Sequence, residues 1–279
     1  MKKILLTGGT GFIGKNIIEQ LSSKYEIYAP RRTELNIVNE ESVRNYLRDK
    51  TFEIVIHCAI LTPNRNAEDK EEDILDYTMR GLLNLKLFEN NFEKIIYIGS
   101  GAEFDKSKNI INAKENDVMN SIPKDAYGYG KYILNQITCN SKNIYNLRIF
   151  GCFGKYEQER RLIRSVIHDC LNNKEIQLKQ NCYFSYVLVD DMIKVIDWAI
   201  ENTPKYHSYN VCNKEKYSLL KIAELIKKLL NSDKKINVYK EGLNKEYTGN
   251  SSRLFDEINF EFKSIEEGIK KEIDWMRGN

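Results

Sequence analysis

The most chemically informative spacing in the sequence is that of a tyrosine and a lysine four residues apart. In the segment YGYGK, Tyr127 and Lys131 would project from one face of a helix, whereas Tyr129 would point elsewhere. A phenol has a pKa of about 10, so it exchanges protons near neutrality only when a nearby cation favours the phenolate. The pair predicts acid–base chemistry, although the same spacing is also common on helix surfaces.

Two neighbouring features favour the chemical interpretation. Gly128 and Gly130 are poor helix formers, each costing about 1 kcal/mol relative to alanine, and they stand where the helix would begin. That cost indicates close approach by another group. Ser100 ends the apolar run EKIIYIGS, which we expect to be a buried strand with Ser100 on its ligand-binding side.

A glycine-rich turn near the start of the chain predicts a dinucleotide site. TGGTGFIG, residues 7–14, follows the apolar run ILL and precedes a stretch with apolar residues at helical spacing. Glycines at three-residue intervals allow a tight turn, contact between a pyrophosphate and the backbone, and close packing of the helix on the sheet. We expect the cofactor to contact Gly8, Thr10, Gly11, Phe12, Ile13 and Gly14.

The end of the second expected strand, YEIYAPRRTEL, bears on which dinucleotide binds. A protein that prefers NAD usually has an acidic residue there for the ribose hydroxyls, whereas this chain has Arg31 and Arg32. A guanidinium can bind a 2′-phosphate through two charged hydrogen bonds. The arginines predict NADP as cofactor, and the alternative is a pair of solvated surface arginines.

These residues need a scaffold, and the sequence predicts a doubly wound, Rossmann-like α/β fold. Strand-like apolar runs occur at KILLTG, YEIYAP, EIVIHCA, EKIIYIGS and IYNLRIF, separated by helical or polar stretches. Ligands lie beyond the carboxyl ends of such strands, which brings Ala59 to the cofactor beside the glycine turn. We expect a dinucleotide-binding domain over 1–151, with 185–201 returning to it, and a substrate lobe over 152–184 and 202–279.

Composition narrows the classes of partner. The 279 residues carry a net charge of +3 from interleaved acids and bases, without the basic stripe typical of proteins that bind nucleic acid or membrane surfaces. No run is long enough for a membrane span, and the expected first strand leaves no room for a signal peptide, so we expect a cytoplasmic protein. The six cysteines and three histidines are scattered, so neither a disulfide framework nor a metal site is predicted.

TGGTGFIG, Ser100 after the fourth strand, and YGYGK together resemble the extended short-chain dehydrogenase/reductase family. More narrowly, the chain is similar to the sugar-nucleotide epimerases, dehydratases and 4-keto reductases of that family, and LRIFGCFG, YVLVDDM, YNVCN and SIEEGIKKEIDWM resemble later landmarks. The resemblance implies that Tyr127 is the acid or base at a carbinol or ketone centre. It also implies that Ser100 hydrogen-bonds the same oxygen and that Lys131 holds the nicotinamide ribose.

The family commonly dimerises through the two helices that here correspond to 72–90 and 127–138, so we expect a homodimer. The apolar residues on these helices either form that contact or pack on their own sheet. They are Ile74, Leu82, Leu85, Ile133 and Leu134.

Departures from the family pattern bear on the nucleotide-sugar substrate. Gly151 stands where relatives usually carry an asparagine near the sugar-nucleotide phosphates, and Phe184 stands where an arginine often contacts the nucleotide. Arg160 and Arg161 could supply replacement charge, and we take them, with Ser100, as candidate substrate-binding residues. Solvated arginines on a helix face are the alternative.

The residues beside Ser100 bear on the reaction. The family's 4,6-dehydratases carry an Asp-Glu pair where this chain has Gly101 and Ala102, and relatives that epimerise neighbouring carbons use a cysteine and a histidine where Ala102 and Arg161 stand. We therefore expect an NADP-dependent reductase of a nucleotide-activated 4-keto-6-deoxy sugar. A sugar-nucleotide epimerase is the alternative, and a non-catalytic NADP-binding protein is a third possibility that the intact Ser100, Tyr127 and Lys131 disfavour.

Overall fold

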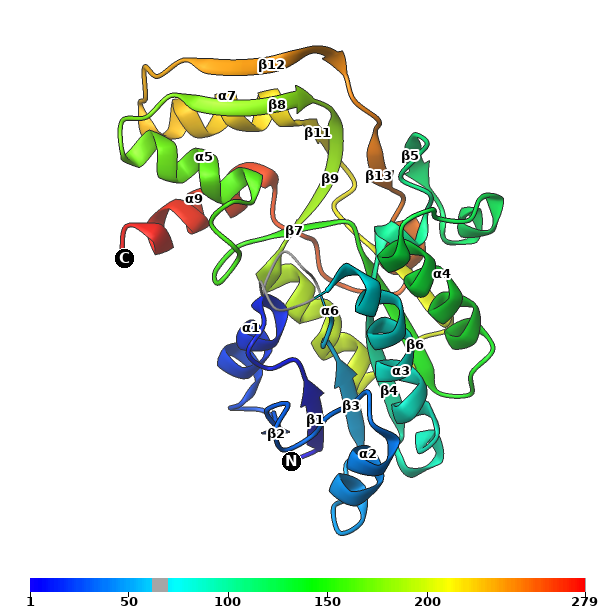
Figure 1. Cartoon of the computed structure of the whole chain (residues 1–279). Coiled ribbons are helices and arrows are strands. Elements are labelled where there is room, and N and C mark those ends of the chain that lie inside the picture. The colour runs from blue at the N-terminus through cyan, green and yellow to red at the C-terminus, as the bar shows by residue number, and fades with distance from the viewer. Residues whose placement is uncertain (62–69, 279) are drawn as a thin grey trace.

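The computed structural model describes residues 1–61 and 70–278. A six-stranded parallel sheet, in the order β10-β6-β4-β3-β1-β2, forms the centre of the molecule (Figure 1). Its strands are β1 (Lys3–Thr7), β2 (Glu26–Tyr28), β3 (Ile54–His57), β4 (Lys94–Ser100), β6 (Ile144–Ile149) and β10 (Ser208–Val211). The first five fall within the five apolar runs of the sequence, which confirms the predicted Rossmann-like fold.

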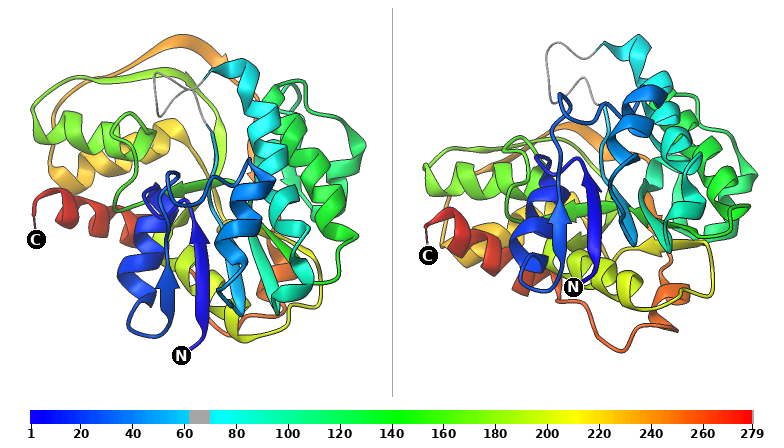
Figure 2. Two further views of the ribbon diagram at one scale, coloured as in Figure 1. Left: turned by 60° about the horizontal axis from the view of Figure 1, so that its bottom comes forward. Right: turned by 90° about the horizontal axis from the view of Figure 1, so that it is seen from below.

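Helices cover both faces of this sheet (Figure 2). One face packs against α1 (Phe12–Leu21) and α6 (Val189–Glu201), and the other against α2 (Glu40–Leu47), α3 (Ile74–Lys86) and α4 (Ala126–Cys139). Successive residues of a strand point to opposite faces, so Ile4 and Leu6 join the first core while Leu5 joins the second. Both faces are buried, which explains why these strands read as continuous apolar runs rather than as alternating patterns.

A second sheet lies beyond the carboxyl ends of the first. It contains β11 (Lys216–Ser218), β9 (Tyr183–Leu188), β13 (Tyr247–Gly249) and β5 (Ile110–Ala113), with β7 (Gly151–Phe153) paired to β9. The ribbon of β8 (Ile176–Asn181) and β12 (Ile236–Leu243) continues it over the helices of the smaller lobe. Those helices, α5 (Leu162–Leu171), α7 (Leu219–Leu230) and α9 (Ile265–Met276), enclose a core of their own.

Two strands cross the expected division between the domains. β10 falls in the stretch 202–279 that we assigned to the substrate lobe, yet it forms the edge of the six-stranded sheet by pairing with β6. β5 falls in 1–151, yet it pairs with β13 of the second sheet. In the described parts of the chain, no helix combines the length and apolar character needed to cross a membrane.

The apolar residues considered for a dimer contact mostly serve the chain's own core. Leu82, Leu85 and Leu134 are fully buried against the sheet, and Ile74 is nearly so. Ile133 alone of the five is half-buried. Of the two alternatives, packing within the chain therefore holds for these four, which α3 and α4 bury within the chain's own core, and Ile133 is the member of the set with surface left for a second subunit.

Candidate functional site

The glycine turn is packed so tightly that side chains would not fit. Gly8 has a φ of +79°, and a Cβ placed there would lie 2.7 Å from the backbone nitrogen of Ala59. A Cβ on Gly14 would lie 2.2 Å from the carbonyl oxygen of Gly8. The turn, the start of α1 and the end of β3 therefore meet at one point on the carboxyl edge of the sheet.

The first turn of α1 offers its N–H groups to an anion. Gly11 is the N-cap residue, so no side chain caps the helix, and the first turn carries no acidic residue. Helices α7 and α9 differ, since Ser218 and Ser264 accept hydrogen bonds from their first turns. Uncapped N–H groups and the positive end of the helix dipole at a glycine cradle fit the pyrophosphate of a dinucleotide.

Arg31 and Arg32 lie next to this turn. They follow β2, which pairs with β1 through Leu5 and Tyr28, and a Cβ on Gly9 would lie 2.8 Å from the Cβ of Ala29. Both arginines are exposed, and the guanidinium of Arg32 lies 5.3 Å from the centre of the Tyr77 ring. The structure thus places both at the edge where the adenosine half of a dinucleotide would end.

Helix α4 brings Tyr127 and Lys131 together. The Asp125 side chain caps the helix by accepting the Gly128 N–H at 2.9 Å. Lys131 is 1 % exposed, its Nζ donates to the carbonyl oxygen of Ile98 at 3.0 Å, and it lies 5.8 Å from the centre of the Tyr127 ring. The predicted i, i+4 arrangement is present, with the cation directed toward the ends of β3 and β4.

The two glycines of YGYGK sit where α4 approaches its neighbours most closely. A Cβ on Gly128 would lie 2.7 Å from the carbonyl oxygen of Ala102, and a Cβ on Gly130 would lie 3.1 Å from Thr78 of α3. The groups that approach are therefore the turn after Ser100 on one side and α3 on the other. Larger side chains at 128 and 130 would push Tyr127 away from Ser100.

Burial controls the charge of Lys131. It lowers the pKa of the Lys131 amine to about 8, while Glu103 and Cys58 act in the opposite direction. Burial also lowers the pKa of nearby His57 to about 3, and His57 instead contacts Thr7 through Nδ1 at 2.7 Å. Lys131 therefore remains cationic at neutral pH beside an uncharged histidine, which is a buried, packed residue.

Ser100 ends β4 and begins the short helix η3 (Gly101–Glu103). Its Oγ accepts the N–H of Ala102 at 3.1 Å, and the hydroxyl is also in hydrogen-bonding contact with the side chain of Tyr247. Ala102 is buried beneath this turn, and a Cβ on Gly101 would lie 2.4 Å from the hydroxyl oxygen of Tyr247. The position next to Ser100 therefore has no room for a carboxylate side chain.

Tyr247, on β13, is a site residue that the sequence did not reveal. It is in hydrogen-bonding contact with Ser100, and burial, with Tyr127 as a further cause, raises its pKa while Ser100 partly offsets this. Its ring lies 5.1 Å from that of Phe150 and 4.8 Å from that of Phe184. A lone tyrosine in the polar stretch NKEYTGN carries no pattern, so only the strand pairing of β13 with β9 could have located it.

The departures at Gly151 and Phe184 have one packing cause. A Cβ on Gly151 would lie 2.8 Å from the carbonyl oxygen of Ser185 and 3.0 Å from Cδ1 of Phe184. The Phe184 ring also packs 5.1 Å from the Tyr186 ring. Phe184 and Tyr186 thus occupy the space that an asparagine at 151 would need, and together with Phe150 and Tyr247 they form an aromatic wall.

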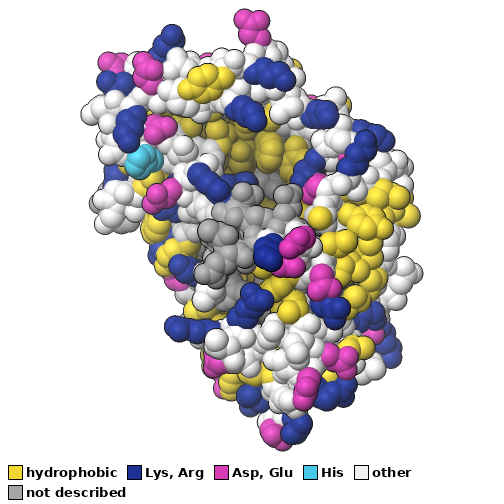
Figure 3. Space-filling view, in the orientation of Figure 1, with side chains coloured by type: hydrophobic (Ala, Val, Ile, Leu, Met, Phe, Trp, Pro, Cys, Tyr) yellow, Lys and Arg dark blue, Asp and Glu magenta, His cyan; other side chains and the backbone are white. Residues whose placement is uncertain are grey.

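Arg160 and Arg161 lie on the loop before α5. Arg161 donates to Glu157 at 3.2 Å and lies close enough for its charge to lower the pKa of Tyr247. Arg160 is exposed and contacts Gln158. Figure 3 shows a hollow between the ribbon of β8 and β12 and the sheet domain, with hydrophobic side chains inside and Lys or Arg side chains around it.

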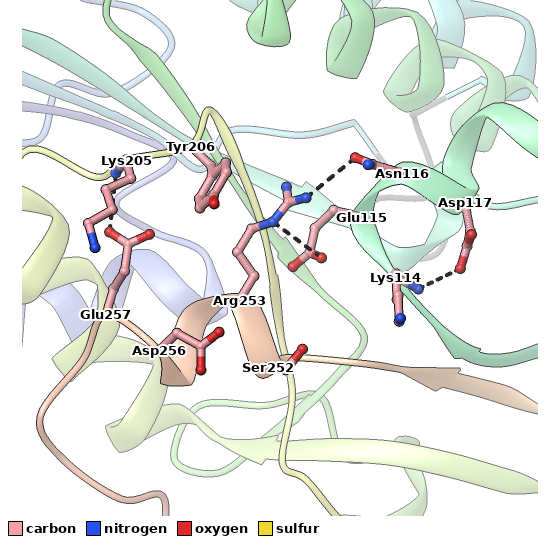
Figure 4. A pocket seen from close by; sticks show the side chains of 10 residues that line it. All are labelled: Lys114, Glu115, Asn116, Asp117, Lys205, Tyr206, Ser252, Arg253, Asp256 and Glu257. Atoms are coloured by element: carbon pink, nitrogen blue, oxygen red, sulfur yellow. Dashed lines mark hydrogen bonds and ion pairs between the residues drawn. The ribbon is translucent and has the colours of Figure 1, made fainter.

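A different cavity, of about 340 Å³, lies near the start of β10 and away from these residues. Figure 4 shows that its central side chain, Arg253, is already paired with Glu115 and Asn116. No residue predicted for the site lines this cavity. Its charges serve to hold η4 (Glu115–Asn120) against α8 (Ser252–Phe255).

Comparison with known proteins gives one family match. Residues 4–212 match the model of the NAD dependent epimerase/dehydratase family. A dTDP-4-dehydro-6-deoxy-D-allose reductase from a Streptomyces species is 23% identical, and the match covers 99% of this chain and 96% of the relative.

Two solved structures show the fold at low identity. The GDP-mannoheptose C4 reductase of Campylobacter jejuni, solved with NADP, is 19% identical at a TM-score of 0.83, covering 99% of this chain and 98% of that one. The UDP-glucose 4-epimerase of Thermotoga maritima, solved with UDP-glucose, is also 19% identical at 0.83, covering 99% of each chain. A reductase and an epimerase are thus equally similar, so the likeness shows the fold and not the reaction.

The depressed pKa of Lys131 predicts a pH-dependent stability. The folded-state value of about 8 lies below the ordinary 10.5, so folding disfavours the cation. This cost is complete below pH 8 and is relieved as the pH rises toward 10.5, because the folded protein then loses the proton first. In urea unfolding, the free energy of unfolding of the wild type, compared with that of Lys131→Met, should rise by about 3 kcal/mol between pH 7 and pH 10.5. The control Lys124→Met, an exposed lysine before α4, should give a difference that does not change with pH; a flat profile for Lys131→Met would contradict the prediction.

Proposed function

The chain belongs to the NAD-dependent epimerase/dehydratase family, and on that premise we propose that it is an NADP-dependent reductase of a nucleotide-activated 4-keto-6-deoxy sugar. The observation that carries the choice of a redox reaction at one carbon is the convergence of Tyr127, Lys131 and Ser100 at the sheet edge, with no room for a second acid or base on the residue after Ser100. One proton carrier suffices to reduce one ketone.

The residues around the glycine turn fit a dinucleotide. The cradle at Gly8, Gly11 and Gly14 would hold the pyrophosphate, and Arg31 and Arg32 would hold a 2′-phosphate. Lys131, buried below Tyr127, would hold the nicotinamide ribose. Bound there, the reduced nicotinamide supplies a hydride for the ketone carbon.

The chain's own groups supply the proton and the orientation. Ser100 would donate its hydroxyl proton to the ketone oxygen in place of its contact with Tyr247, while its Oγ accepts the Ala102 N–H. The Tyr127 hydroxyl gives its proton to the same oxygen as the alkoxide develops. The buried ammonium of Lys131 favours the resulting phenolate, and solvent then restores the phenol proton.

The surroundings of Ser100 argue against elimination and against epimerisation of neighbouring carbons. Both reactions need a further acid or base near the substrate. Tyr247 fills the space beside Gly101, and burial raises its pKa, so its hydroxyl keeps its proton at neutral pH. A hydroxyl of this kind orients a sugar oxygen and does not exchange its proton.

The alternative is an epimerase acting at a single carbon. Such an enzyme oxidises and then reduces the same carbon, and the Tyr127, Lys131 and Ser100 group would serve it equally well. The preference for a reductase rests on Arg31 and Arg32, which favour NADP. Arg161 and the basic side chains around the hollow support an anionic nucleotide-sugar substrate for either reaction.

The proposed cofactor preference predicts an unequal loss of binding. Replacing Arg31 and Arg32 together by alanine should weaken the binding of NADPH about tenfold or more relative to the binding of NADH, because only NADPH carries the 2′-phosphate. Calorimetry at fixed salt measures both dissociation constants. The control variant replaces two other exposed arginines, Arg44 on α2 and Arg48 just after it. It should leave the ratio of the NADPH and NADH dissociation constants unchanged. Equal losses for NADPH and NADH in the first variant would refute the assignment.

We further propose a homodimer in which α3 and α4 face a second copy. Tyr129, Ile133 and Ile137 are spaced four residues apart on α4 and are at least partly exposed, and Figure 3 shows hydrophobic side chains gathered on the side of α4 and β5. Light scattering at micromolar concentration should give twice the chain mass. Ile133→Glu should give a folded monomer, whereas Asn140→Glu, just past the end of α4, should leave the mass unchanged. A monomeric wild type would rule out the dimer.

The proposed reaction predicts stoichiometric consumption of NADPH. In a screen of keto sugar nucleotides, the turned-over compound should give one reduced sugar per NADPH, with no solvent deuterium at sugar carbons by NMR. Tyr127→Phe should lose turnover by several orders of magnitude while keeping cofactor affinity, and Tyr129→Phe, an exposed neighbour, should keep both. Interconversion of two sugar nucleotides without net use of NADPH would establish the epimerase instead.

A further inference from the structure

Behind Ser100 lies a cluster of buried polar side chains that the proposed reaction does not use. Its centre is Glu103, at the end of η3, whose Oε1 accepts the Ser100 backbone N–H at 3.1 Å. Arg148, on β6, donates to Glu103 Oε2 at 2.5 Å, and both side chains are 0 % exposed. Asn146 donates to both carboxylate oxygens at 3.1 Å. Glu103 is thus a buried carboxylate one turn from the proposed hydrogen-bond donor.

The same cluster reaches the helix that carries Tyr127 and Lys131. Arg148 donates to Oδ1 of Asn135 at 2.7 Å, and Asn135 lies on α4 one turn after Lys131. A second nitrogen of Arg148 donates to Asn210 of β10 at 2.9 Å. The pair of Glu103 and Arg148 therefore ties the Ser100 turn to α4 through the centre of the sheet.

The geometry of this cluster leaves no space for adjustment. A Cβ on Gly99 would lie 1.9 Å from Oδ1 of Asn146 and 2.5 Å from Oε1 of Glu103. A buried ion pair that served only to fill the core could be replaced by apolar residues at little cost. The hydrogen bond to the Ser100 N–H is what an apolar replacement could not supply.

We infer that Glu103 is a positioning residue, which holds Ser100 in register with Tyr127 and places a negative charge behind Lys131. Its effect on turnover rests on the proposed function, whereas its effect on Lys131 does not. The groups that face Lys131 come from four elements: Tyr127 from its own helix, Tyr97 from β4, His57 and Cys58 at the end of β3, and Glu103 from η3.

Among these groups, Glu103 carries the compensating charge. Burial lowers the pKa of His57 to about 3, raises that of Cys58 to about 12 and raises that of Tyr97, so all three are neutral near pH 7. Glu103, ion-paired with Arg148, raises the pKa of Lys131. Removing its charge should therefore make Lys131 lose its proton at lower pH.

The test is a proton titration of Lys131 in the full chain without cofactor or substrate. With lysine labelled with ¹³C, the Lys131 signal is assigned by its loss in Lys131→Met. In Glu103→Gln, which keeps the shape of the side chain, the midpoint should fall by about one unit or more. This change leaves the Arg148 cation unpaired, which destabilises the fold and adds to the fall. The companion variant Glu103→Gln with Arg148→Met removes both charges and should show a smaller fall in the same direction.

The chain offers a matched control in Glu115. This carboxylate is also buried, accepts the Asn210 N–H at 2.9 Å and pairs with Arg253 at 3.6 Å, but it lies at the cavity of Figure 4 and not behind Ser100. Glu115→Gln should therefore leave the Lys131 midpoint unchanged. A purely structural role would make the two substitutions alike.

Turnover provides the second measurement. With a ketone substrate, Glu103→Met combined with Arg148→Met, which removes the acceptor of the Ser100 N–H, should lose kcat on the order of 100-fold with a nearly unchanged cofactor dissociation constant at pH 6, because Ser100 is displaced while the cofactor cradle is intact. Glu103→Gln should lose less, because its amide oxygen can still accept that N–H. An unchanged Lys131 midpoint in both Glu103→Gln variants, or an equal fall in Glu115→Gln, would overturn the inference. Absence of any turnover in the wild type would count against the proposed reductase alone, since the titration needs no substrate.

Discussion

The close approach of helix α4 to the carboxyl edge of the sheet is the constraint on which the site depends. Gly128 and Gly130 let the helix backbone contact the turn after Ser100 and helix α3, respectively. Because α4 lies this close to the sheet, the Lys131 amine can donate a hydrogen bond to the carbonyl oxygen of Ile98. A helix held farther out by larger side chains would leave the lysine in solvent with an ordinary pKa and would separate Tyr127 from Ser100. The unfavourable helix propensity of two glycines is thus the local cost of a site in which a buried cation lies beneath a phenol.

Lys131 is a buried cation, and the groups around it compensate its charge only in part. The neutral Tyr97 ring lies 4.3 Å from the Lys131 amine, the His57 imidazole in its electrostatic range is also neutral, and the carboxylate that acts on it, Glu103, is itself paired with Arg148. The pKa of about 8 is the result of these opposing effects, with burial the largest. It leaves Lys131 charged at neutral pH but with its charge weakly solvated, which strengthens its electrostatic effect on the Tyr127 hydroxyl.

The sequence predicted the parts of the candidate site whose residues lie close together in the chain. The glycine turn, the pair of Tyr127 and Lys131, and Ser100 at the end of an apolar run each depend on one element and its end, so spacing was enough. Tyr247 and the pair of Glu103 and Arg148 depend on contacts across 45 residues or more of sequence. No local pattern marks such contacts. The arginine inside the apolar run IYNLRIF was the one available signal, because a buried guanidinium requires a carboxylate partner that the sequence alone does not locate.

The aromatic wall connects these observations to the substrate. In the sequence, Gly151 and Phe184 are two separate departures from the family pattern. In the structure they have one cause, because Phe184 and Tyr186 take the volume that a side chain at 151 would occupy. Restoring only the asparagine at 151 would therefore force it against Phe184 without recreating a polar site. The loop that carries Arg161 lies close enough to Tyr247 for the guanidinium charge to lower the pKa of Tyr247. If the substrate is the proposed nucleotide sugar, its flat, apolar parts would therefore stack on the aromatic wall, and its phosphates would depend on cations such as Arg161.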